Sequence, residues 1–386
     1  TPDHSPPPTD TSTVLQHWMA LIRQAHQAQT PVYILGGHTK PGARLHDPQP
    51  SAGVDTRSYT GVVSYEPSEL VVTVRAGTPL KALEDLLATQ GQSLPFEPPR
   101  FSDGGTVGGM VAAGLSGPAR ASVGAVRDYV LGVQLINGLG EHLTFGGQVM
   151  KNVAGYDVSR VMAGSCGSLG LITDVSLKVL PVAVAETTLR FTMAQETALL
   201  QLARWRARPL PLNASCWVQD TTTQPAQAVL YVRLRGAQAA VETAAQQMLQ
   251  EAPGLRLDDP GTQADWEACR DHRLPFFEAT DPHAALWRVS VPQNTPPLTA
   301  LGPTLVEWHG GQRWVWAPLE AADQIRASAA SAGGHATLFR APQEGDTSTV
   351  PRHTTPSPAV QAIQRRLKTA FDPQGIFNPG IWGHGF

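Results

Sequence analysis

The sequence predicts an α+β protein of two domains, and three observations support this. Sixteen of the thirty-six glycines lie between Gly104 and Gly170, in the first half of the chain, where the sequence predicts short helices and strands. From about residue 186 to 340, strand, helix, strand and strand signals alternate, which favours an antiparallel sheet. Pro181 marks the end of the first domain. Because glycine lets the main chain approach a ligand closely, at a cost in ordering entropy, the glycine-rich region is interpreted as the lining of a cofactor cleft.

The elements of the first domain follow from hydrophobic periodicity and from helix signals. A helix is expected over residues 14–25, where apolar residues recur at helical spacing, and a second over residues 80–88. Thr78 is the expected N-cap of the second helix, with Pro79 at its first position. Strands are expected at residues 32–35, 62–65, 70–75, 129–136 and 171–179, with a loop and helix around residues 149–162.

The second domain has its own set of signals. A helix is expected over residues 237–250, and strands at residues 228–234, 287–291, 305–308 and 314–316. The polar, proline-rich residues 344–358 are interpreted as a linker, followed by a helix over residues 359–371. Seven of the nine tryptophans fall between Trp205 and Trp316, where we expect them to build a core or an exposed surface for association rather than a substrate site.

Composition and charge exclude several classes of protein. The net charge is -3 and there is no basic stripe, so we expect no nucleic-acid partner. No stretch reaches about 18 uncharged apolar residues, and no secretory signal opens the chain, so a cytoplasmic protein without a membrane span is expected. The opening residues 1–12, rich in Pro, Ser and Thr, are expected to be a flexible leader.

The three cysteines exclude several kinds of site. Cys166, Cys216 and Cys269 are odd in number and widely spaced. This pattern does not fit a zinc site, an iron–sulfur cluster held by this chain alone, or a disulfide framework. We expect buried single thiols and no metal.

Two glycine-rich loops carry the candidate chemistry. The segment ILGGHTK at residues 34–40 is neither a Walker A loop nor a Rossmann turn. Its successive amides could form a nest for a pyrophosphate, with Thr39 and Lys40 adding a hydroxyl and a charge, although an ordinary turn is the alternative. The second loop, GGTVGG at residues 104–109, also lies beside β structure. Together the two loops could hold an extended dinucleotide between two subdomains.

At this point the residues carry a family resemblance that extends over nearly the whole chain after the leader. The motifs are GGHTK, DTRSYTGVV, LVVTVRAGTPL, LPFEPP, GGTVGGMVAAGLSGP, GAVRDYVLG, KNVAGYDVSR, GSCGSLGLITDVSLKVLP and FDPQGIFNPG. Together they resemble the FAD-binding fold of the vanillyl-alcohol-oxidase and p-cresol-methylhydroxylase (PCMH) type. More closely, they resemble the FAD-binding subunit of bacterial glycolate oxidase.

The resemblance implies a set of cofactor-binding residues. The pyrophosphate loop would be Gly36, Gly37, His38, Thr39 and Lys40. The loop along the ribityl chain and isoalloxazine would be Gly104, Gly105, Thr106, Val107, Gly108 and Gly109, continued by Ser116, Gly117 and Gly124. Main-chain contacts to the adenine side would come from Gly167, Gly170 and Ile172, and the closing C-terminal motif would be Phe377, Asn378 and Pro379.

Three further residues or pairs have open interpretations. Relatives of the berberine-bridge type tether the flavin to the His of GGH, but the relatives most similar to this chain hold FAD without a bond, so non-covalent binding is expected at His38. His335 lies in a segment that resembles glycolate-oxidase flavin subunits, and a packed or hydrogen-bonded role is expected for it. Arg127 and Asp128 could be an active-site pair, but a structural ion pair suits them at least as well.

The resemblance implies a two-domain flavoprotein: an FAD-binding domain at residues 13–184, an inserted second domain at 185–343, a linker at 344–355, and a C-terminal segment, 356–386, that returns to the first domain.

The expected function is that of an accessory FAD subunit, for electron transfer or assembly, in a multi-subunit glycolate oxidase. Its partners would be a paralogous catalytic FAD subunit and an iron–sulfur subunit, with peripheral membrane association through them. The HGDGN-like run of the catalytic subunit is missing from this chain. The alternatives are a self-sufficient FAD-dependent alcohol or hydroxy-acid oxidase, with or without a bond to His38, and a non-redox scaffold subunit.

Overall fold

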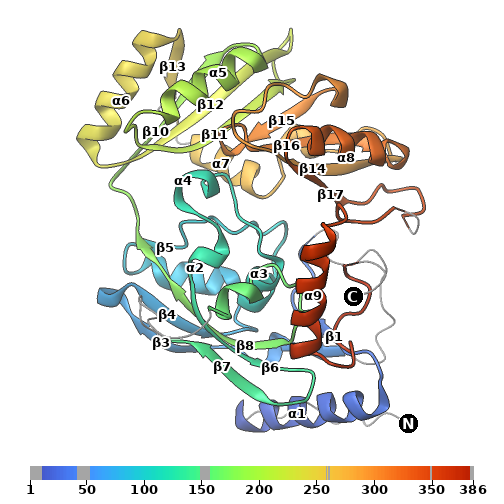
Figure 1. The fold of residues 1–386 in the computed structure, drawn as a ribbon. Helices are drawn as coiled ribbons and strands as arrows, with labels where there is room; N and C mark the ends of the chain where they lie inside the picture. Colours follow the sequence, from blue (N-terminus) through green and yellow to red (C-terminus); the bar gives the residue numbers. More distant parts are fainter. Residues whose placement is uncertain are drawn as a thin grey trace.

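The computed structural model describes residues 11–40, 53–147, 157–257, 259, 261–347 and 350–382. Two sheets dominate these residues, and they lie one above the other in Figure 1. Most of the expected leader and part of the expected helix around residues 149–162 lie outside the described residues. None of the described helices is long and apolar enough to span a membrane.

The first sheet is antiparallel and has the strand order β3-β4-β8-β6-β7. Its strands are β3 (Val62–Glu66), β4 (Val71–Arg75), β6 (Val130–Ile136), β7 (His142–Gly146) and β8 (Leu171–Lys178). Helices α2 (Leu80–Ala88) and α3 (Val107–Ala113) cover the face that is turned toward the second sheet (Figure 1). Leu83, Met110 and Val175 meet in the core between these helices and the sheet.

A smaller unit closes the other side of the first domain. Helix α1 (Thr11–Ala28) packs its apolar face, including Trp18 and Ile22, against Phe377 near the end of the chain. Beside it, β1 (Tyr33–Leu35) pairs in parallel with β2 (Gly53–Asp55), a strand that the sequence did not predict. A short antiparallel pair, β5 (Gln92–Ser93) with β9 (Leu180–Pro181), lies where the chain leaves the domain.

The second sheet is antiparallel and has the strand order β13-β10-β12-β11-β15-β16-β14-β17. Its strands are β10 (Ala185–Thr192), β11 (Leu212–Asp220), β12 (Gln227–Gly236), β13 (Gly254–Leu257), β14 (Ala284–Ser290), β15 (Thr304–Glu307), β16 (Gln312–Pro318) and β17 (His335–Arg340). Its helices are α5 (Gln195–Arg206), α6 (Gln238–Glu251), α7 (Gly261–Arg270) and α8 (Ala322–Ser331). One apolar cluster packs α5 and α6 against the sheet, a second packs α7, and a third packs α8.

The C-terminal segment connects the two sheets. Residues after β17 run along its edge, where Leu338 N donates to the Arg352 carbonyl at 2.8 Å. Helix α9 (Pro358–Phe371) then returns to the first domain. There the buried Lys368 Nζ donates to Asp372 at 2.7 Å and to the Ser168 carbonyl at 2.6 Å.

The bounds predicted for the second helix, residues 80–88, are confirmed, but the N-cap predicted at Thr78 is wrong, and Pro79 is the cap residue rather than the first helical one. Helix α2 begins at Leu80, and the Thr78 hydroxyl instead accepts a hydrogen bond from Gly61 N at 3.0 Å. The reason is a neighbouring loop: the Leu80 amide, which a cap would otherwise satisfy, donates to the Gly105 carbonyl at 2.7 Å.

Of the two roles expected for the tryptophans of the second domain, the core is confirmed and the exposed surface is wrong. Five of the seven tryptophans in question are buried among the apolar clusters of the second domain: Trp205, Trp217, Trp266, Trp287 and Trp314.

The expected pair of Arg127 with Asp128 is replaced by other contacts of Asp128. Its carboxylate accepts from Ala125 N at 2.8 Å and lies 3.9 Å from Arg160. Asp128 therefore fixes a short turn before β6, and the expected ion pair between these two neighbouring residues is wrong.

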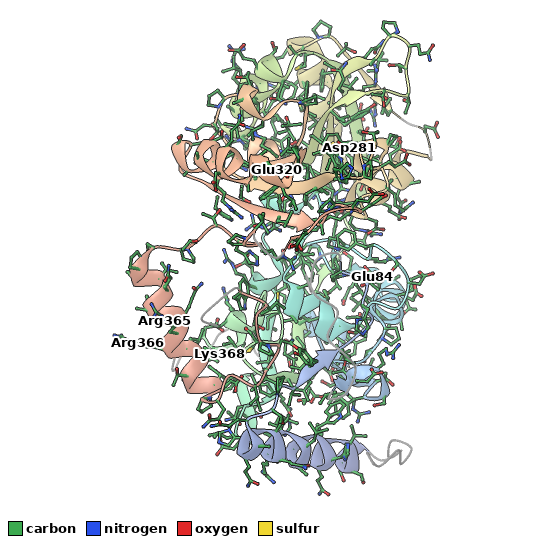
Figure 2. All side chains as sticks on the ribbon, turned by 90° about the vertical axis from the view of Figure 1, so that its right-hand side faces the viewer. Glu84, Asp281, Glu320, Arg365, Arg366 and Lys368 are labelled. Atoms are coloured by element: carbon green, nitrogen blue, oxygen red, sulfur yellow. The ribbon has the colours of Figure 1, made fainter. Side chains whose placement is uncertain are left out.

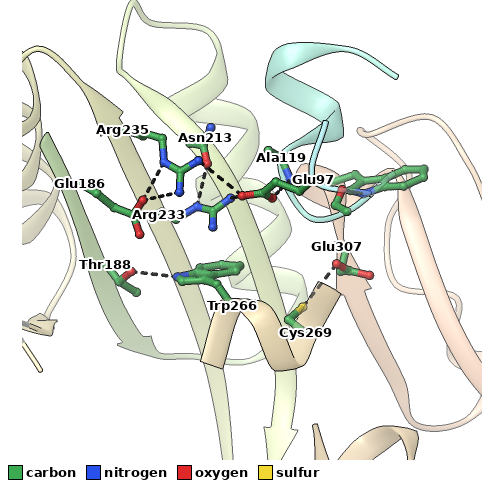
Figure 3. A network of polar contacts seen from close by, with 12 residues as sticks. Glu97, Ala119, Glu186, Thr188, Asn213, Arg233, Arg235, Trp266, Cys269 and Glu307 are labelled. Carbon is green, nitrogen blue, oxygen red and sulfur yellow. Dashed lines mark hydrogen bonds and ion pairs between the residues drawn. The ribbon is translucent and has the colours of Figure 1, made fainter. Parts of the chain in front are cut away.

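A buried ion pair joins the two domains (Figure 3). Glu97, in the LPFEPP loop of the first domain, lies 2.5 Å from Arg233 of β12, whose side chain is only 3% exposed. The other Glu97 oxygen accepts from Ala119 N at 3.1 Å, and Arg233 also donates to Asn213 at 2.7 Å. Both charges therefore have several partners, as a buried pair requires.

We predict that Glu97→Gln lowers the free energy of unfolding by about 3 kcal/mol, because it leaves Arg233 buried without its charged partner. Asp85→Asn, which breaks an exposed pair with Lys81, serves as the control and should cost less than about 0.5 kcal/mol. Urea unfolding of both variants measures the difference. Equal stabilities for the two variants would show that the pair between the domains contributes nothing.

Candidate functional site

Two glycine-rich loops of the first domain lie directly against each other. The first, residues 36–40, follows β1, and the second, residues 104–109, leads into α3. A Cβ on Gly37 would lie 1.7 Å from the Gly104 carbonyl oxygen, so no side chain fits there. The structure therefore brings together the two loops that the sequence placed about seventy residues apart.

The backbone amides of these loops fall into two groups. Those of Val107, Gly108 and Gly109 donate to the Thr78 carbonyl, the Ala76 carbonyl and the Thr106 hydroxyl. Those of residues 37–39 and 104–106 donate to no acceptor among the residues that the structure describes. These amides lie on two loops that touch, and successive free amides of this kind can form a nest for an anion.

The side chains of the first loop differ in their settings. Thr39 is buried and His38 is exposed, with a left-handed backbone (φ 52°). Lys40 Nζ donates to the Pro99 carbonyl and lies 5.4 Å from the centre of the Phe101 ring. Burial lowers the pKa of Lys40 to about 8, although Asp271 and Glu84 act in the opposite direction.

Asn378 ties a third segment to the loops. Its Oδ1 accepts from Ile34 N of β1 at 3.0 Å, and its Nδ2 donates to the Cys166 carbonyl at 2.8 Å. A Cβ on Gly167 would lie 2.6 Å from Asn378 Nδ2, so this position also needs glycine. The predicted C-terminal motif thus fixes the chain around Cys166 beside the first loop.

Other predicted site residues have roles in packing. A Cβ on Gly108 would lie 2.7 Å from that of Ala76, and one on Gly117 would lie 2.5 Å from the Glu97 carbonyl oxygen. Gly124 ends helix α4 (Arg120–Val123) at a φ of 100°. A Cβ on Gly170 would lie 3.0 Å from the Ile136 carbonyl oxygen. The buried Ile172 pairs with Leu135 in the first sheet. The Ser116 hydroxyl accepts a hydrogen bond from Val126 N at 3.3 Å. Packing alone excludes a larger residue at Gly108 and Gly117, whereas backbone conformation favours glycine at position 124.

These features fit an FAD molecule. A diphosphate could accept from free amides of the two loops, and nothing of the described protein lies within 4 Å of a Cβ built on Gly104, which leaves room beside the loop. Ser165 Oγ, next to Cys166, is buried without a hydrogen-bond partner. The groups that such a cofactor needs, namely backbone donors, open space and a hydroxyl, are present in the three segments.

A small cavity between the two domains includes residues that the sequence analysis missed. Ser116 and Gly117 line it from the first domain, and Arg288, Glu307 and Trp308 line it from the second. Trp308 Nε1 donates to the Gly117 carbonyl at 3.0 Å, which holds the two sides together. Burial raises the pKa of Glu307. No sequence motif marks Arg288, Glu307 or Trp308, because residues that are far apart in the sequence meet here only in the folded protein.

The remaining candidates are not gathered into this site. His335 is exposed at the start of β17 rather than packed. The three cysteines are free thiols: Cys216 and Cys269 are buried as expected, and Cys166 is half-buried. The described residues contain no group of three or more His, Cys, Asp or Glu side chains arranged to hold a metal ion.

Comparisons with known proteins agree with this geometry. A family described as FAD binding domain matches residues 14–146. The chain is 41% identical over 364 residues to the glycolate oxidase subunit GlcE of Escherichia coli K12, which covers 94% of this chain and 96% of that protein. It is 30% identical over 129 residues to the glycolate oxidase subunit GlcD of Bacillus subtilis 168, covering 33% of this chain and 27% of that protein. The structure of an alkyldihydroxyacetonephosphate synthase has the same fold, with a TM-score of 0.66 at 17% identity over 94% of this chain and 75% of that one.

We predict that Gly104→Ala weakens FAD binding at least about tenfold, because the new methyl group would occupy the space beside the loop. Gly302→Ala is a matched control: it also adds a methyl group at a positive φ with nothing within 4 Å, but in a turn of the second domain. Both variants should lose about 1–2 kcal/mol of stability through backbone strain. Flavin content after purification and fluorescence titration measure the difference. Equal FAD affinity in the two variants would contradict the assignment of this loop.

Proposed function

The chain belongs to the family of the glycolate oxidase subunit GlcE, a family of FAD-binding oxidoreductase subunits, and on that premise we propose that it is an accessory FAD subunit of a multi-subunit 2-hydroxy-acid oxidase. In this role it would bind one FAD without a covalent bond and serve electron transfer or assembly. The observation that carries the proposal is the extent of the match: GlcE aligns over 94% of this chain, and GlcD over a third.

The chain's own residues would bind and orient the cofactor. The amides of residues 37–39 and 104–106 would donate to the diphosphate, and Asn378 would hold the chain around Cys166 in place. Lys40, with a pKa of about 8, would be mostly protonated at neutral pH and would add a positive charge near the nest. When bound, FAD supplies the redox chemistry, and the protein supplies its position and its electrostatic surroundings.

The accessory role follows from what hydroxy-acid oxidation requires. Removing hydride from a 2-hydroxy acid needs a base near the hydroxyl group and a cation or metal that fixes the carboxylate. The sequence has no HGDGN-like run to supply the His, Asp and Asn of the catalytic subunit. A partner that carries such a run would complete the reaction, with an iron–sulfur subunit to take the electrons onward.

We predict that acid precipitation releases the flavin into the supernatant. The exposed His38 lies on the first loop, where it can donate to a phosphate without bonding to the ring. The measurement is the visible spectrum of the pellet and of the supernatant. Yellow colour that stays in the pellet of the wild-type protein and disappears from it in His38→Ala would establish a covalent bond instead.

We also predict that the isolated chain oxidises glycolate or D-lactate poorly and is required for activity when mixed with its partner subunits. The test is anaerobic mixing of the FAD-loaded chain with each acid while absorbance is followed near about 450 nm. Rapid bleaching by either acid without partners would make the chain a self-sufficient oxidase. Full activity of the partner subunits in the absence of this chain would contradict the accessory role.

A further inference from the structure

We propose that Cys216 and Cys269 form a redox-active pair of thiols, which peroxide oxidises to a disulfide between β11 and α7. The proposal goes beyond the proposed function, because it needs neither a bound FAD nor a partner subunit. It assigns a modification site to two residues that neither the motifs nor the comparisons indicate.

The sheet and helix α7 bring the two cysteines to one place. Cys216 of β11 is the register partner of Glu307 of β15. Residues paired directly across an antiparallel ladder point to the same face of the sheet, with Cβ atoms about 4.5–5.5 Å apart. Cys269, in the last turn of α7, reaches this face, and its Sγ donates to Glu307 Oε1 at 3.4 Å (Figure 3). Both thiols therefore lie beside the side chain of Glu307.

The two thiols also interact with each other. A hydrogen bond with the Cys216 thiol raises the pKa of Cys269 well above its usual range, and burial and the negative charge of Glu307 raise it further. Both cysteines are 3% exposed and belong to one apolar cluster, which also contains Trp266 and Trp314. Both are free thiols, so the structure represents the reduced state of the pair.

Glu307 is placed to take up the proton that oxidation of the thiol releases. Besides the Cys269 thiol, its carboxylate accepts hydrogen bonds from Trp314 Nε1 at 2.6 Å and from Gln312 Nε2 at 3.0 Å. Burial raises the pKa of Glu307, which favours its protonated form. Cys269 and Glu307 both line the cavity between the domains, and a molecule as small as hydrogen peroxide would meet the sulfur there.

The oxidation proceeds in two balanced steps. In the first, the Cys269 thiol gives its proton to Glu307, and the thiolate attacks one oxygen of hydrogen peroxide. The O–O bond breaks, a sulfenic acid forms, and the released hydroxide takes the proton from Glu307 to become water. In the second, the Cys216 sulfur attacks the sulfenic acid. The S–S bond forms, the S–O bond breaks, and the hydroxyl group leaves with the Cys216 proton as a second water.

The disulfide would form next to a contact between the two domains. Two residues after Cys269, Asp271 accepts a hydrogen bond from Arg100 N of the first domain at 2.9 Å. Arg100 in turn pairs at 2.6 Å with Glu84, which lies near the junction of the domains (Figure 2). Oxidation also removes the thiol hydrogen that Cys269 donates to Glu307. The redox state of the pair is therefore coupled to one wall of the cavity and to the contact beside it.

The test is treatment of the purified full-length chain, in its native state, with hydrogen peroxide. Free thiols are then blocked, and the chain is digested with trypsin without reductant and analysed by mass spectrometry. Lys178, Arg233 and Arg256 separate the three cysteines in the sequence, so trypsin places each cysteine on its own peptide. We expect one cross-linked pair of peptides, which joins Cys216 to Cys269 and which dithiothreitol separates.

Three variants identify the roles of the thiols. Cys216→Ala should abolish the cross-link and leave Cys269 as a sulfenic acid that dimedone labels, because no second thiol condenses with it. Cys269→Ala should abolish the cross-link and leave the Cys216 peptide unlabelled. Cys166→Ala is the matched control, because it removes the third free thiol, and it should form the cross-link at the wild-type rate.

Three results would overturn the proposal. The first is the absence of the Cys216–Cys269 cross-link in the treated wild-type chain. The second is a cross-link that forms only after the chain has been unfolded in urea, and the third is a mixture in which Cys166 is cross-linked as often. The wild-type peptide map decides the question even where an alanine variant does not fold. Because FAD and the partner subunits play no part in this experiment, its failure leaves the proposed function unaffected.

Discussion

The ion pair between Glu97 and Arg233 sets the geometry on which the functional part of the molecule depends. It fixes the LPFEPP loop of the first domain against β12 of the second. Through Ala119 N it also fixes the segment after Gly117, whose carbonyl is bound by Trp308. These contacts join the two domains close to the cavity between them, and Trp308 and Gly117 both line that cavity. A buried pair is a weak source of stability compared with apolar packing, but it specifies one arrangement, because a shifted domain would leave both charges unpaired.

The glycines of the first domain divide into two physical classes. Gly37, Gly108 and Gly117 are glycine because backbone or side-chain atoms of the protein already occupy the space of a Cβ. Gly104 has no such neighbour, and its amide and those beside it lack acceptors among the described residues. The first class lets the loops approach each other, and the second is then left facing the space that a ligand can fill. A cofactor cleft lined by backbone therefore needs both classes, and composition alone cannot separate them.

Periodicity and motifs predicted most of the elements and the two loops correctly, because these depend on neighbours in the sequence. Helix α2 was predicted with its observed bounds, and β8 to within one residue. The predicted N-cap of α2, Thr78, was wrong because the first amide of the helix donates to the carbonyl of Gly105, a residue of a distant loop. The buried positions of Trp205 and Trp287, and the pairing of β1 with β2, were likewise decided by tertiary packing. The LPFEPP motif was recognised in the sequence, but the contact that its Glu97 makes could not be predicted, because the partner, Arg233 of β12, lies 136 positions away.

The arginines of the second domain show why the partners of a side chain are invisible in the sequence and evident in the fold. Arg233 and Arg288 both lie on central strands, and nothing in their local sequence separates them. The fold gives Arg233 a carboxylate, an amide oxygen and the face of Trp266 at 4.9 Å. Among the described residues, Arg288 faces the Phe339 ring at 5.8 Å, with Arg352, Arg120 and the Cys166 thiol close enough to affect its pKa. In the described part of the chain, the same sheet thus supplies a full set of polar partners for one arginine and none for the other, a difference that the local sequence does not predict.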